Sequence, residues 1–372
     1  MVVRILTFDP DGDLYLRLTY PLEKISPFKT EDGAKADTGG NASDSWTNAV
    51  VLLPPGSAYG STEAVEDTHS DSAEEAPKKV DMLVSSKHLM LASPVFKAMF
   101  RRGGFLEGNK LQSGGVVVIP FPDDDPDIFK ILLNIVHGRV RQVPEKVGID
   151  DLTGLAILVD KYQMHEVVEF HVRMWMLALR KSLPTKLDST LLAWISVCYV
   201  FRLSAEYRQV TRLAELESYG PLGVEEEQDL PIPAHVLDRI ERHRQAIIAS
   251  LLGTIIGIMG AYNKASVICP SIYNDNLESR NYACDSMIVG SMLKSASSQG
   301  LWPLPLAPYP GRSIKQTAEE TRKLKLVAMC DAPFNYWGQS SPLPAHGVIK
   351  YLHDAASRAE KECEGLAFDG AT

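Results

Sequence analysis

Two segments of the chain carry the apolar–polar alternation of a half-buried β-strand. The apolar positions are Leu14, Leu16 and Leu18 in the first segment and Val80, Met82 and Val84 in the second. Because alternate side chains of a strand share one face, each segment turns its apolar residues toward a core. A third run, residues 116–119, is β-branched throughout and predicts a buried strand. We expect the first two strands to pair, although a long segment separates them.

A pair of helices is predicted over residues 88–100, between the second and third strands. Ser93 followed by Pro94 marks the start of the second helix, because a serine hydroxyl accepts a spare N–H and proline suits the first helical position. Apolar residues then recur at helical spacing, namely Val95, Phe96, Met99 and Phe100. No residue pattern between Met82 and Phe121 suggests chemistry, so we interpret this stretch as a surface for docking.

Helical periodicity continues through the rest of the chain. Helices are predicted near 128–136, 152–159 and 166–183, and the acidic run 122–127 is interpreted as the N-terminal cap of the first. The order of two strands, two helices, one strand and three helices indicates an α+β domain. After Pro184 the pattern is helical only. The expected helices there are 191–201, 207–214, 234–262, 285–298, 317–329 and 348–366.

These motifs, in this order, resemble the BTB/POZ domain. The matching stretches are Asp13–Leu16, Lys87–Leu89, Leu91–Phe100, Phe105–Glu107, Val116–Ile119, Phe129–Gly138 and Leu158–Tyr162. More narrowly, the stretches His88–Met99, Ile131–Pro144 and Leu158–Glu169 resemble BTB proteins of filamentous fungi. The resemblance implies a BTB/POZ fold of short, mostly antiparallel strands covered by a helical cluster, followed by an all-α C-terminal domain. One departure is Val136-His137-Gly138, where animal domains usually have Tyr-Thr-Gly.

The resemblance also implies a function in protein–protein interaction. BTB domains generally form dimers or bind partner proteins, among them the cullin-type scaffolds of ubiquitin ligases. Many cullin binders carry a hydrophobic residue, any residue and a glutamate after the second helix, and Phe105, Leu106 and Glu107 match that pattern. The alternative for Phe105 is a place in the core. The residues that carry the signature of the fold are Asp13, His88, Leu91, Ser93, Pro94, Phe96, Met99, Asp160 and Tyr162.

Composition and resemblance together divide the chain into four parts. Residues 8–20 and 80–183 form the BTB/POZ domain, 184–366 form the helical C-terminal domain, and 367–372 form a disordered tail. Between the first two strands, 21–79 is rich in Gly, Ser, Asp and Glu and cannot bury enough apolar surface to order itself. We expect a largely disordered acidic insertion, which is either a solubilising spacer or a phosphorylated segment.

The charge and the cysteines narrow the class of protein. The formal net charge of -9 argues against a phosphate-binding surface, since nucleic-acid binders normally carry a basic patch. Five cysteines are scattered without a C-x-x-C pair, which favours a reducing compartment over a disulfide framework or a zinc module. The N-terminus lacks the residue order of a signal peptide. We therefore expect an intracellular protein, cytoplasmic or nuclear, without cofactor, bound metal or direct nucleic-acid contact.

No catalytic constellation emerges from the sequence. The histidines are dispersed, and the chain has no G-x-S-x-G, P-loop or G-x-G-x-x-G motif. The favoured function is a non-enzymatic adaptor that acts through protein–protein interaction and self-association. The alternatives are a substrate adaptor of a cullin-type ubiquitin ligase and a transcription-associated scaffold.

One stretch raises the question of a membrane. Residues 246–262 carry no charge and are at the short limit for crossing a bilayer. The amphipathic pattern that begins at Val236 continues into this stretch, which favours a buried helix and a protein without membrane contact. Gly253 and Gly257, four residues apart, predict close packing against another helix.

Overall fold

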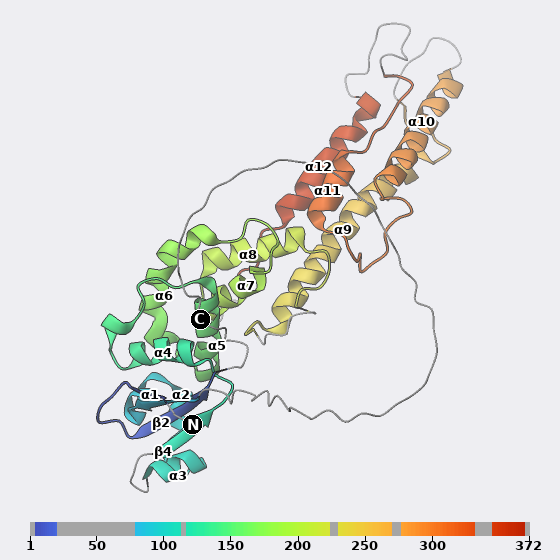
Figure 1. Ribbon diagram of the computed structural model, residues 1–372. Helices are drawn as coiled ribbons and strands as arrows, with labels where there is room; N and C mark the ends of the chain where they lie inside the picture. Colours follow the sequence, from blue (N-terminus) through green and yellow to red (C-terminus); the bar gives the residue numbers. More distant parts are fainter. Residues whose placement is uncertain are drawn as a thin grey trace, which may run out of the picture.

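The computed structural model describes residues 4–20, 79–112, 117–223, 230–269, 277–331 and 344–368. The protein is α+β: one small sheet lies at one end of the molecule and helices make up the rest (Figure 1). The last four helices project away from the sheet as a bundle, so the described part of the chain is elongated. The predicted insertion, 21–79, lies outside the described residues except for its last residue, Lys79.

Four strands form one mixed sheet in the order β1-β3-β2-β4. They are β1 Arg4–Thr7, β2 Leu14–Thr19, β3 Lys79–Val84 and β4 Val117–Phe121. The predicted pairing of the first two segments is confirmed, because β2 runs antiparallel to β3 with Leu16 opposite Met82. The pattern does not predict β1, whose side chains are mostly exposed.

The expectation of mostly antiparallel strands is wrong. β1 is parallel to β3, and β2 is parallel to β4. The reason lies in the connections. The antiparallel strand β3 returns the chain to the end of the sheet where β2 begins, and the helices that follow carry it across to the other edge of β2. There β4 runs in the same direction as β2. Two parallel strands cannot be joined by a tight hairpin and need a long connection between them.

The β-branched run forms an edge strand and is not fully buried as predicted. Ile119 and Phe121 of β4 face the core, while Val118 and Pro120 are exposed. Proline donates no N–H to a sheet and is tolerated in an edge strand for that reason. A short apolar run does not reveal whether one or both of its faces will be covered.

The helix pair is present as predicted. It consists of α1 Ser86–Ala92 and α2 Pro94–Met99, and Ser93 Oγ caps α2 by accepting the Phe96 N–H at 3.0 Å. A short helix that the pattern does not reveal, α3 Leu106–Gln112, follows. Phe105, which directly precedes α3, and Leu106, its first residue, are exposed, so no apolar face marks it as a core helix.

Three further helices complete the N-terminal half. They are α4 Pro126–Val136, α5 Ile149–Tyr162 and α6 His165–Leu179. The acidic run caps α4 as interpreted: the Asp125 carboxylate accepts the N–H groups of Asp127 and Ile128 at 2.9 and 3.3 Å, and Pro126 is the first helical residue. An acidic cap also complements the positive end of the helix dipole.

The C-terminal half is helical, as expected, with differences at the ends of helices. The helices are α7 Leu191–Val200, α8 Ser204–Glu217, α9 Ala234–Tyr262, α10 Leu277–Ser298, α11 Ile314–Arg322 and α12 Val348–Glu362. α10 starts earlier than predicted, and α11 starts before the predicted 317–329 and ends at Arg322. Residues 324–328 are neither helix nor strand, and their apolar side chains Leu324, Leu326 and Ala328 are buried alternately.

The described residues contain two hydrophobic cores. The first core runs from Phe8 to Ile240 and includes the sheet, and the second runs from Ile247 to Cys363. The cores therefore divide within α9, and the domain boundary predicted at 183/184 does not separate them. α7 explains the difference: it is apolar on all sides and packs against both α5 and α8, so it belongs to the same core as the sheet.

A polar junction lies between the two cores. Arg244 of α9 is fully buried, and its guanidinium donates to both carboxylate oxygens of Glu241 at 2.7 and 2.6 Å. The same group donates to the carbonyl oxygens of Pro308, Tyr309 and Arg312 at 2.8, 3.2 and 2.6 Å. A buried charge is tolerated when it is paired and hydrogen-bonded in this way. Arg244 thus joins α9 to the segment before α11.

The end of the chain returns to the first core. Leu366 is buried, and its N–H donates to Thr211 Oγ1 of α8 at 2.8 Å. The ring of Phe368 stacks on Tyr207 with centroids 4.4 Å apart. Phe368, which we expected in the disordered tail, is therefore packed, because it has an aromatic partner that the linear pattern does not show, whereas Ala367 is exposed. Residues 369–372 lie outside the described part.

Replacing Arg244 tests the polar junction. Arg244→Ala would leave three carbonyls without this donor and the Glu241 carboxylate with Gln245 as its remaining side-chain donor, and breaking a buried ion pair costs about 3–5 kcal/mol. We expect the free energy of unfolding to fall by about that amount in urea titrations followed by circular dichroism. Arg242→Ala, an exposed change two residues away on α9, should alter it by less than about 0.5 kcal/mol. Equal effects of the two changes would contradict the assignment.

Candidate functional site

The helix pair α1–α2 is fixed to α5 through Ser93 and Tyr162. Ser93 Oγ donates to the carbonyl oxygen of Tyr162 at 2.6 Å while it accepts the Phe96 N–H, so one buried hydroxyl serves two helices. Phe96 stacks on the Tyr162 ring at 4.7 Å and on Phe100 at 5.6 Å. The signature residues Ser93, Phe96 and Tyr162 therefore form one buried contact, which positions α2.

The hydroxyl of Tyr162 has its own partner. It donates a short hydrogen bond to the Asp124 carboxylate, which also accepts from Lys161 Nζ at 2.7 Å. Burial raises the pKa of Tyr162, and the hydrogen bond to the nearby carboxylate raises it further. The hydroxyl thus stays protonated as a donor. Tyr162 carries a structural hydrogen bond.

Asp13 and His137 hold the start of α1. The Asp13 carboxylate accepts the N–H and the hydroxyl of Ser86 at 2.8 and 2.7 Å. His137, at the end of α4, accepts the Ser85 N–H at Nε2 at 3.1 Å, and its Nδ1 lies 2.9 Å from the Leu133 carbonyl oxygen, to which it donates. His137 therefore has a structural role in this chain.

Other predicted signature residues lie at the surface. Leu91 of α1 is 87% exposed, and Asp160 of α5 is also exposed. His88 is partly exposed, 4.0 Å from the Asp9 carboxylate and edge-on to the His137 ring. Pro94 and Met99 are exposed and half-buried, respectively, and line the groove described next.

The triplet Phe105, Leu106 and Glu107 lies at the start of α3, beside α2. Phe105 is 62% exposed and Leu106 is 73% exposed, so the alternative that Phe105 is a core residue is wrong. A groove of about 480 Å³ opens here, which we call the α2–α3 groove. Its lining residues are Pro94, Val95, Ala98, Met99, Phe105, Glu107 and Gln163. The groove is apolar except for one acid and one amide, and the structure brings two members of the predicted triplet into it.

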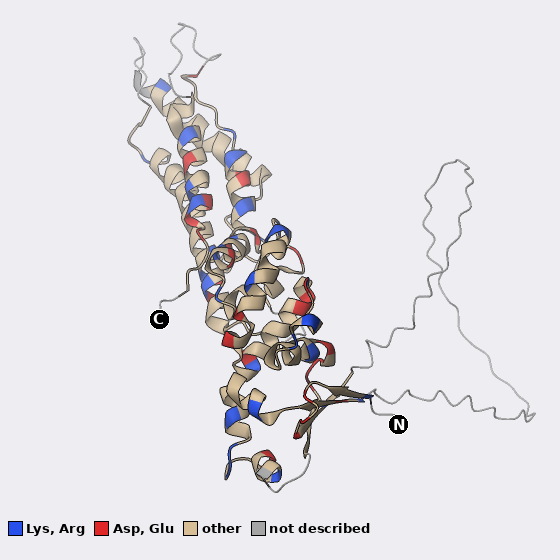
Figure 2. Ribbon diagram, turned by 90° about the vertical axis from the view of Figure 1, so that its left-hand side faces the viewer, with Lys and Arg blue, Asp and Glu red and all other residues tan. Residues whose placement is uncertain are grey.

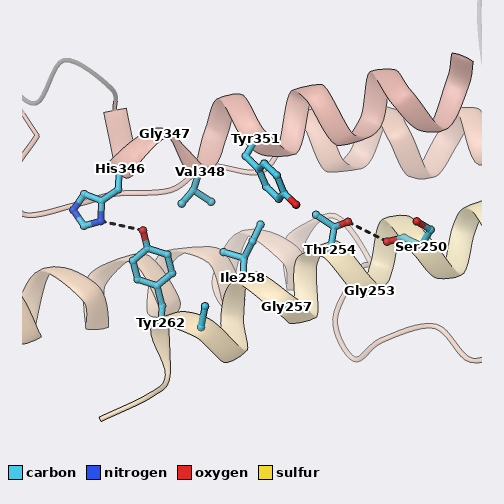
Figure 3. Close-up of a pocket in the computed structure, with 11 residues that line it drawn as sticks. Ser250, Gly253, Thr254, Gly257, Ile258, Tyr262, His346, Gly347, Val348 and Tyr351 are labelled. Carbon is cyan, nitrogen blue, oxygen red and sulfur yellow. Dashed lines mark hydrogen bonds between the residues drawn. The ribbon is translucent and has the colours of Figure 1, made fainter. Parts of the chain in front are cut away.

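A second groove, of about 620 Å³, lies between α9 and α12 (Figure 3). Gly253 and Gly257 of α9 form its floor, with nothing within 4 Å of the position that a Cβ would occupy at either residue. The prediction that these glycines serve close helix packing is therefore wrong. At one end of the groove Tyr262 Oη lies 3.1 Å from Nδ1 of His346.

The helix α9 meets the length and composition expected of a membrane span, as buried helices of soluble proteins also do. Its apolar residues on one face, Ile247, Ile248, Leu251, Leu252, Ile255 and Ile258, are buried in the second core. On the other face Ile256 is exposed beside the open glycine positions. The predicted buried helix is thus present on one face only.

Beyond His346 lies a cluster of potential metal ligands. Cys269, Cys284, Cys330 and His346 each present one ligand atom, and the four atoms lie within 4.8 Å of one another. Cys284 Sγ is 3.7 Å from Cys330 Sγ and 3.5 Å from His346 Nε2, and Cys330 Sγ is 3.1 Å from the same nitrogen. All three cysteines are buried. We call this set the Cys₃His cluster.

Sequence reasoning misses this cluster for a physical reason. Motif searches depend on ligands that are close in sequence, such as the two cysteines of a C-x-x-C knuckle. Here fourteen, forty-five and fifteen residues separate positions 269, 284, 330 and 346, so the ligands come together only when the helices pack. The expected helices offered little signal: Cys269, Cys284 and Cys330 all lie outside them, Cys284 directly before 285–298 and Cys330 directly after 317–329.

The backbone at the cluster is strained. Ala345, His346 and Gly347 have successive positive φ values of 48, 58 and 81°. A non-glycine residue in this region costs roughly 1–3 kcal/mol and persists only where surrounding contacts hold it. One such contact is the Ala345 N–H, which donates to the Asp331 carboxylate at 2.9 Å. Burial lowers the pKa of His346, although Asp285 and Asp331 act the other way, so the ring is a neutral donor of an electron pair.

Comparison with known proteins identifies no relative of the chain. No family model, no curated protein and no solved structure matches the chain.

His137 makes stability depend on pH. Burial lowers its pKa, and His88 and Arg139 lower it further, whereas the Leu133 hydrogen bond and Asp9 raise it. In the unfolded chain the ring takes up a proton below about pH 6.5, but in the folded chain it resists protonation. The free energy of unfolding should therefore fall as the pH drops through about 6.5.

His137→Gln isolates that contribution from His171 and His346, whose pKa values burial also lowers. We expect the variant to be less stable than the wild type at pH 7.5, but with a shallower loss between pH 7.5 and pH 5.5 in urea titrations. His165→Gln, a change at an exposed histidine of α6, serves as the control. A slope unchanged by His137→Gln would show that this ring does not carry the effect.

Proposed function

We propose that the protein is a non-enzymatic adaptor, and that residues 4–20 and 79–183 form a BTB-like module that binds partner proteins. The observation that carries the proposal is the α2–α3 groove. Phe105, which lines the groove, and the next residue, Leu106, are both exposed, although exposed apolar side chains normally occur singly. An apolar groove with adjoining exposed residues marks an interaction site.

The chemistry of the groove selects the occupant. Val95, Ala98 and Met99 offer an apolar wall, and methionine adapts its shape to different partners. Glu107 supplies a single negative charge at the edge. A helix or extended segment of another protein fits this arrangement if it carries one large apolar side chain and, beside it, a Lys, an Arg or an unpaired N–H. Ser93 and Tyr162 hold α2 rigidly behind the groove, which lowers the entropic cost of binding.

The charge distribution also supports a protein partner. Figure 2 shows Lys and Arg interspersed with Asp and Glu along the described helices. A phosphate backbone is normally bound by a basic patch or stripe, and mixed charges do not favour one.

A cullin-type scaffold is the specific form of partner that the triplet supports. In cullin binders with this pattern, the hydrophobic residue fills a pocket near the acid. Phe105 and Glu107 line the same groove here. This placement favours the cullin alternative over the transcription-associated scaffold, for which no described residue offers comparable support.

Self-association is proposed through the sheet. β1 has a strand neighbour on one side only among the described residues, and its Ile5 is 58% exposed. An edge strand presents unpaired N–H and C=O groups that a second copy can complete.

The groove is tested by changing its rim. Phe105→Ala and Glu107→Ala should each weaken capture of the partner, identified by pull-down and mass spectrometry with the full chain as bait. Loss of a central aromatic contact typically costs about 2 kcal/mol or more, or roughly 30-fold in affinity. Phe170→Ala, a change at an equally exposed phenylalanine on α6, is the matched control and should leave capture unchanged. If both groove variants capture the same proteins at wild-type levels, the groove is not the site.

Self-association is tested by light scattering. We expect a dimer at tens of micromolar protein, and Ile5→Lys should shift it toward monomer, because a charge on an edge strand opposes strand pairing. Circular dichroism should show the same helical content in both proteins. A strict monomer of the wild type would remove self-association from the proposal and leave the groove untouched.

A further inference from the structure

The second core contains a set of side chains that the adaptor function does not use. We propose that Cys269, Cys284, Cys330 and His346 bind one structural zinc ion, which closes the outer end of the α9–α12 bundle. The proposal concerns a different part of the chain from the α2–α3 groove and does not depend on it.

The interatomic distances suit a tetrahedral zinc site. With Zn–S near 2.3 Å and Zn–N near 2.0–2.1 Å, tetrahedral geometry places two sulfurs about 3.8 Å apart and a sulfur and a nitrogen about 3.5 Å apart. The observed separations are 3.7 Å for Cys284 to Cys330 and 3.5 Å for Cys284 to His346. The Cys330–His346 separation, 3.1 Å, needs a small outward movement of one side chain.

The type and number of ligands point to zinc in a closed, structural site. Three thiolates and one imidazole form the Cys₃His set typical of structural zinc, whereas calcium and magnesium prefer oxygen ligands. Four protein ligands leave no open position for substrate, so no catalytic step is implied. The sulfurs are too far apart for a disulfide, whose S–S bond is about 2.05 Å, and none of the three cysteines is disulfide-bonded.

Hydrogen bonds between neighbours of the ligands hold the ligands in place. The Ile268 N–H donates to the Asp285 carboxylate at 2.6 Å and thereby joins the residues adjacent to Cys269 and Cys284. The Ala345 N–H donates to the Asp331 carboxylate at 2.9 Å and joins the residues adjacent to His346 and Cys330. Each bond brings two ligands together from segments far apart in the sequence. This is the supporting shell that a preorganised metal site needs.

The side chain of His346 is also oriented for metal binding. Its Nε2 faces the sulfurs, while Nδ1 lies 3.1 Å from the Tyr262 hydroxyl oxygen. With Nε2 as the ligand, Nδ1 carries the proton and donates it to Tyr262, an arrangement that fixes the ring of a zinc-bound histidine. The left-handed backbone at Ala345 and His346 is what turns the ring inward.

The zinc would tie together four pieces of chain. Cys269 follows α9, Cys284 lies on α10, Cys330 follows α11, and His346 precedes α12. The ion would thus connect all four helices of the bundle at the end far from the sheet (Figure 1). His346 and Tyr262 also line the open groove of Figure 3, which gives the metal and chelators a route to the cluster.

The test begins with the metal content of the full-length protein purified without chelator. We expect one zinc per chain by plasma mass spectrometry, and loss of it in Cys330→Ala and His346→Ala. Cys363→Ala is the matched control, because Cys363 is an equally buried cysteine of the same core outside the cluster. It should keep its zinc. The wild type loaded with Co²⁺ should show the visible absorption and thiolate charge-transfer bands of a tetrahedral sulfur-rich site.

A second measurement covers variants that fail to fold. Removing zinc from the wild type with a chelator should lower its melting temperature, and adding zinc back should restore it, since binding to the native state alone stabilises it. Folded wild type that neither contains nor takes up zinc would overturn the proposal. So would zinc content unchanged in Cys330→Ala and His346→Ala, iron in place of zinc, or a Cys284–Cys330 disulfide in the isolated protein.

Discussion

The structure depends on one helix that belongs to two cores. On α9, Val236 and Ile240 are buried in the first core, and six apolar residues between positions 247 and 258 are buried in the second. The charged Arg244 is buried where the two cores meet. A guanidinium in that position must find partners for its donors, and it finds them on Glu241 and on three carbonyls of the segment before α11. Because those bonds are directional, they set how the outer bundle continues from the inner one, which apolar packing alone would leave less defined.

The two candidate sites lie in different cores and have opposite characters. The α2–α3 groove is open and apolar, and the buried Ser93–Tyr162 contact supports it from behind. The cysteines of the Cys₃His cluster are buried. Strained backbone and two hydrogen bonds from backbone N–H groups to carboxylates lie next to the ligands. An open groove on a rigid frame suits reversible binding, whereas a buried ligand set suits a fixed structural role. The arrangement therefore separates partner binding from stabilisation of the outer bundle.

Local physical rules account for much of the fold. The alternation of Leu14, Leu16 and Leu18 predicts β2, and Ser93-Pro94 and Asp125-Pro126 predict the starts of α2 and α4, because these effects act within one turn or strand. The candidate groove is partly of this kind, since Phe105 and Glu107 are close in sequence. The exposure of the groove does not follow from local rules, because the packing of α3 beside α2 decides which side of Phe105 remains open.

The sequence by itself thus determined most of the elements, though not β1 or α3, their order, and the long-range pairing of β2 with β3. Tertiary structure alone decided the parallel neighbours β1 and β4, the division of the cores inside α9, and the open glycine face at Gly253. Tertiary structure also brings together the side chains of Cys269, Cys284, Cys330 and His346. The physical reason is the range of the interaction. Periodicity and capping act between near neighbours, whereas strand order, core boundaries and dispersed ligands depend on contacts between segments whose separation along the chain carries no local signal.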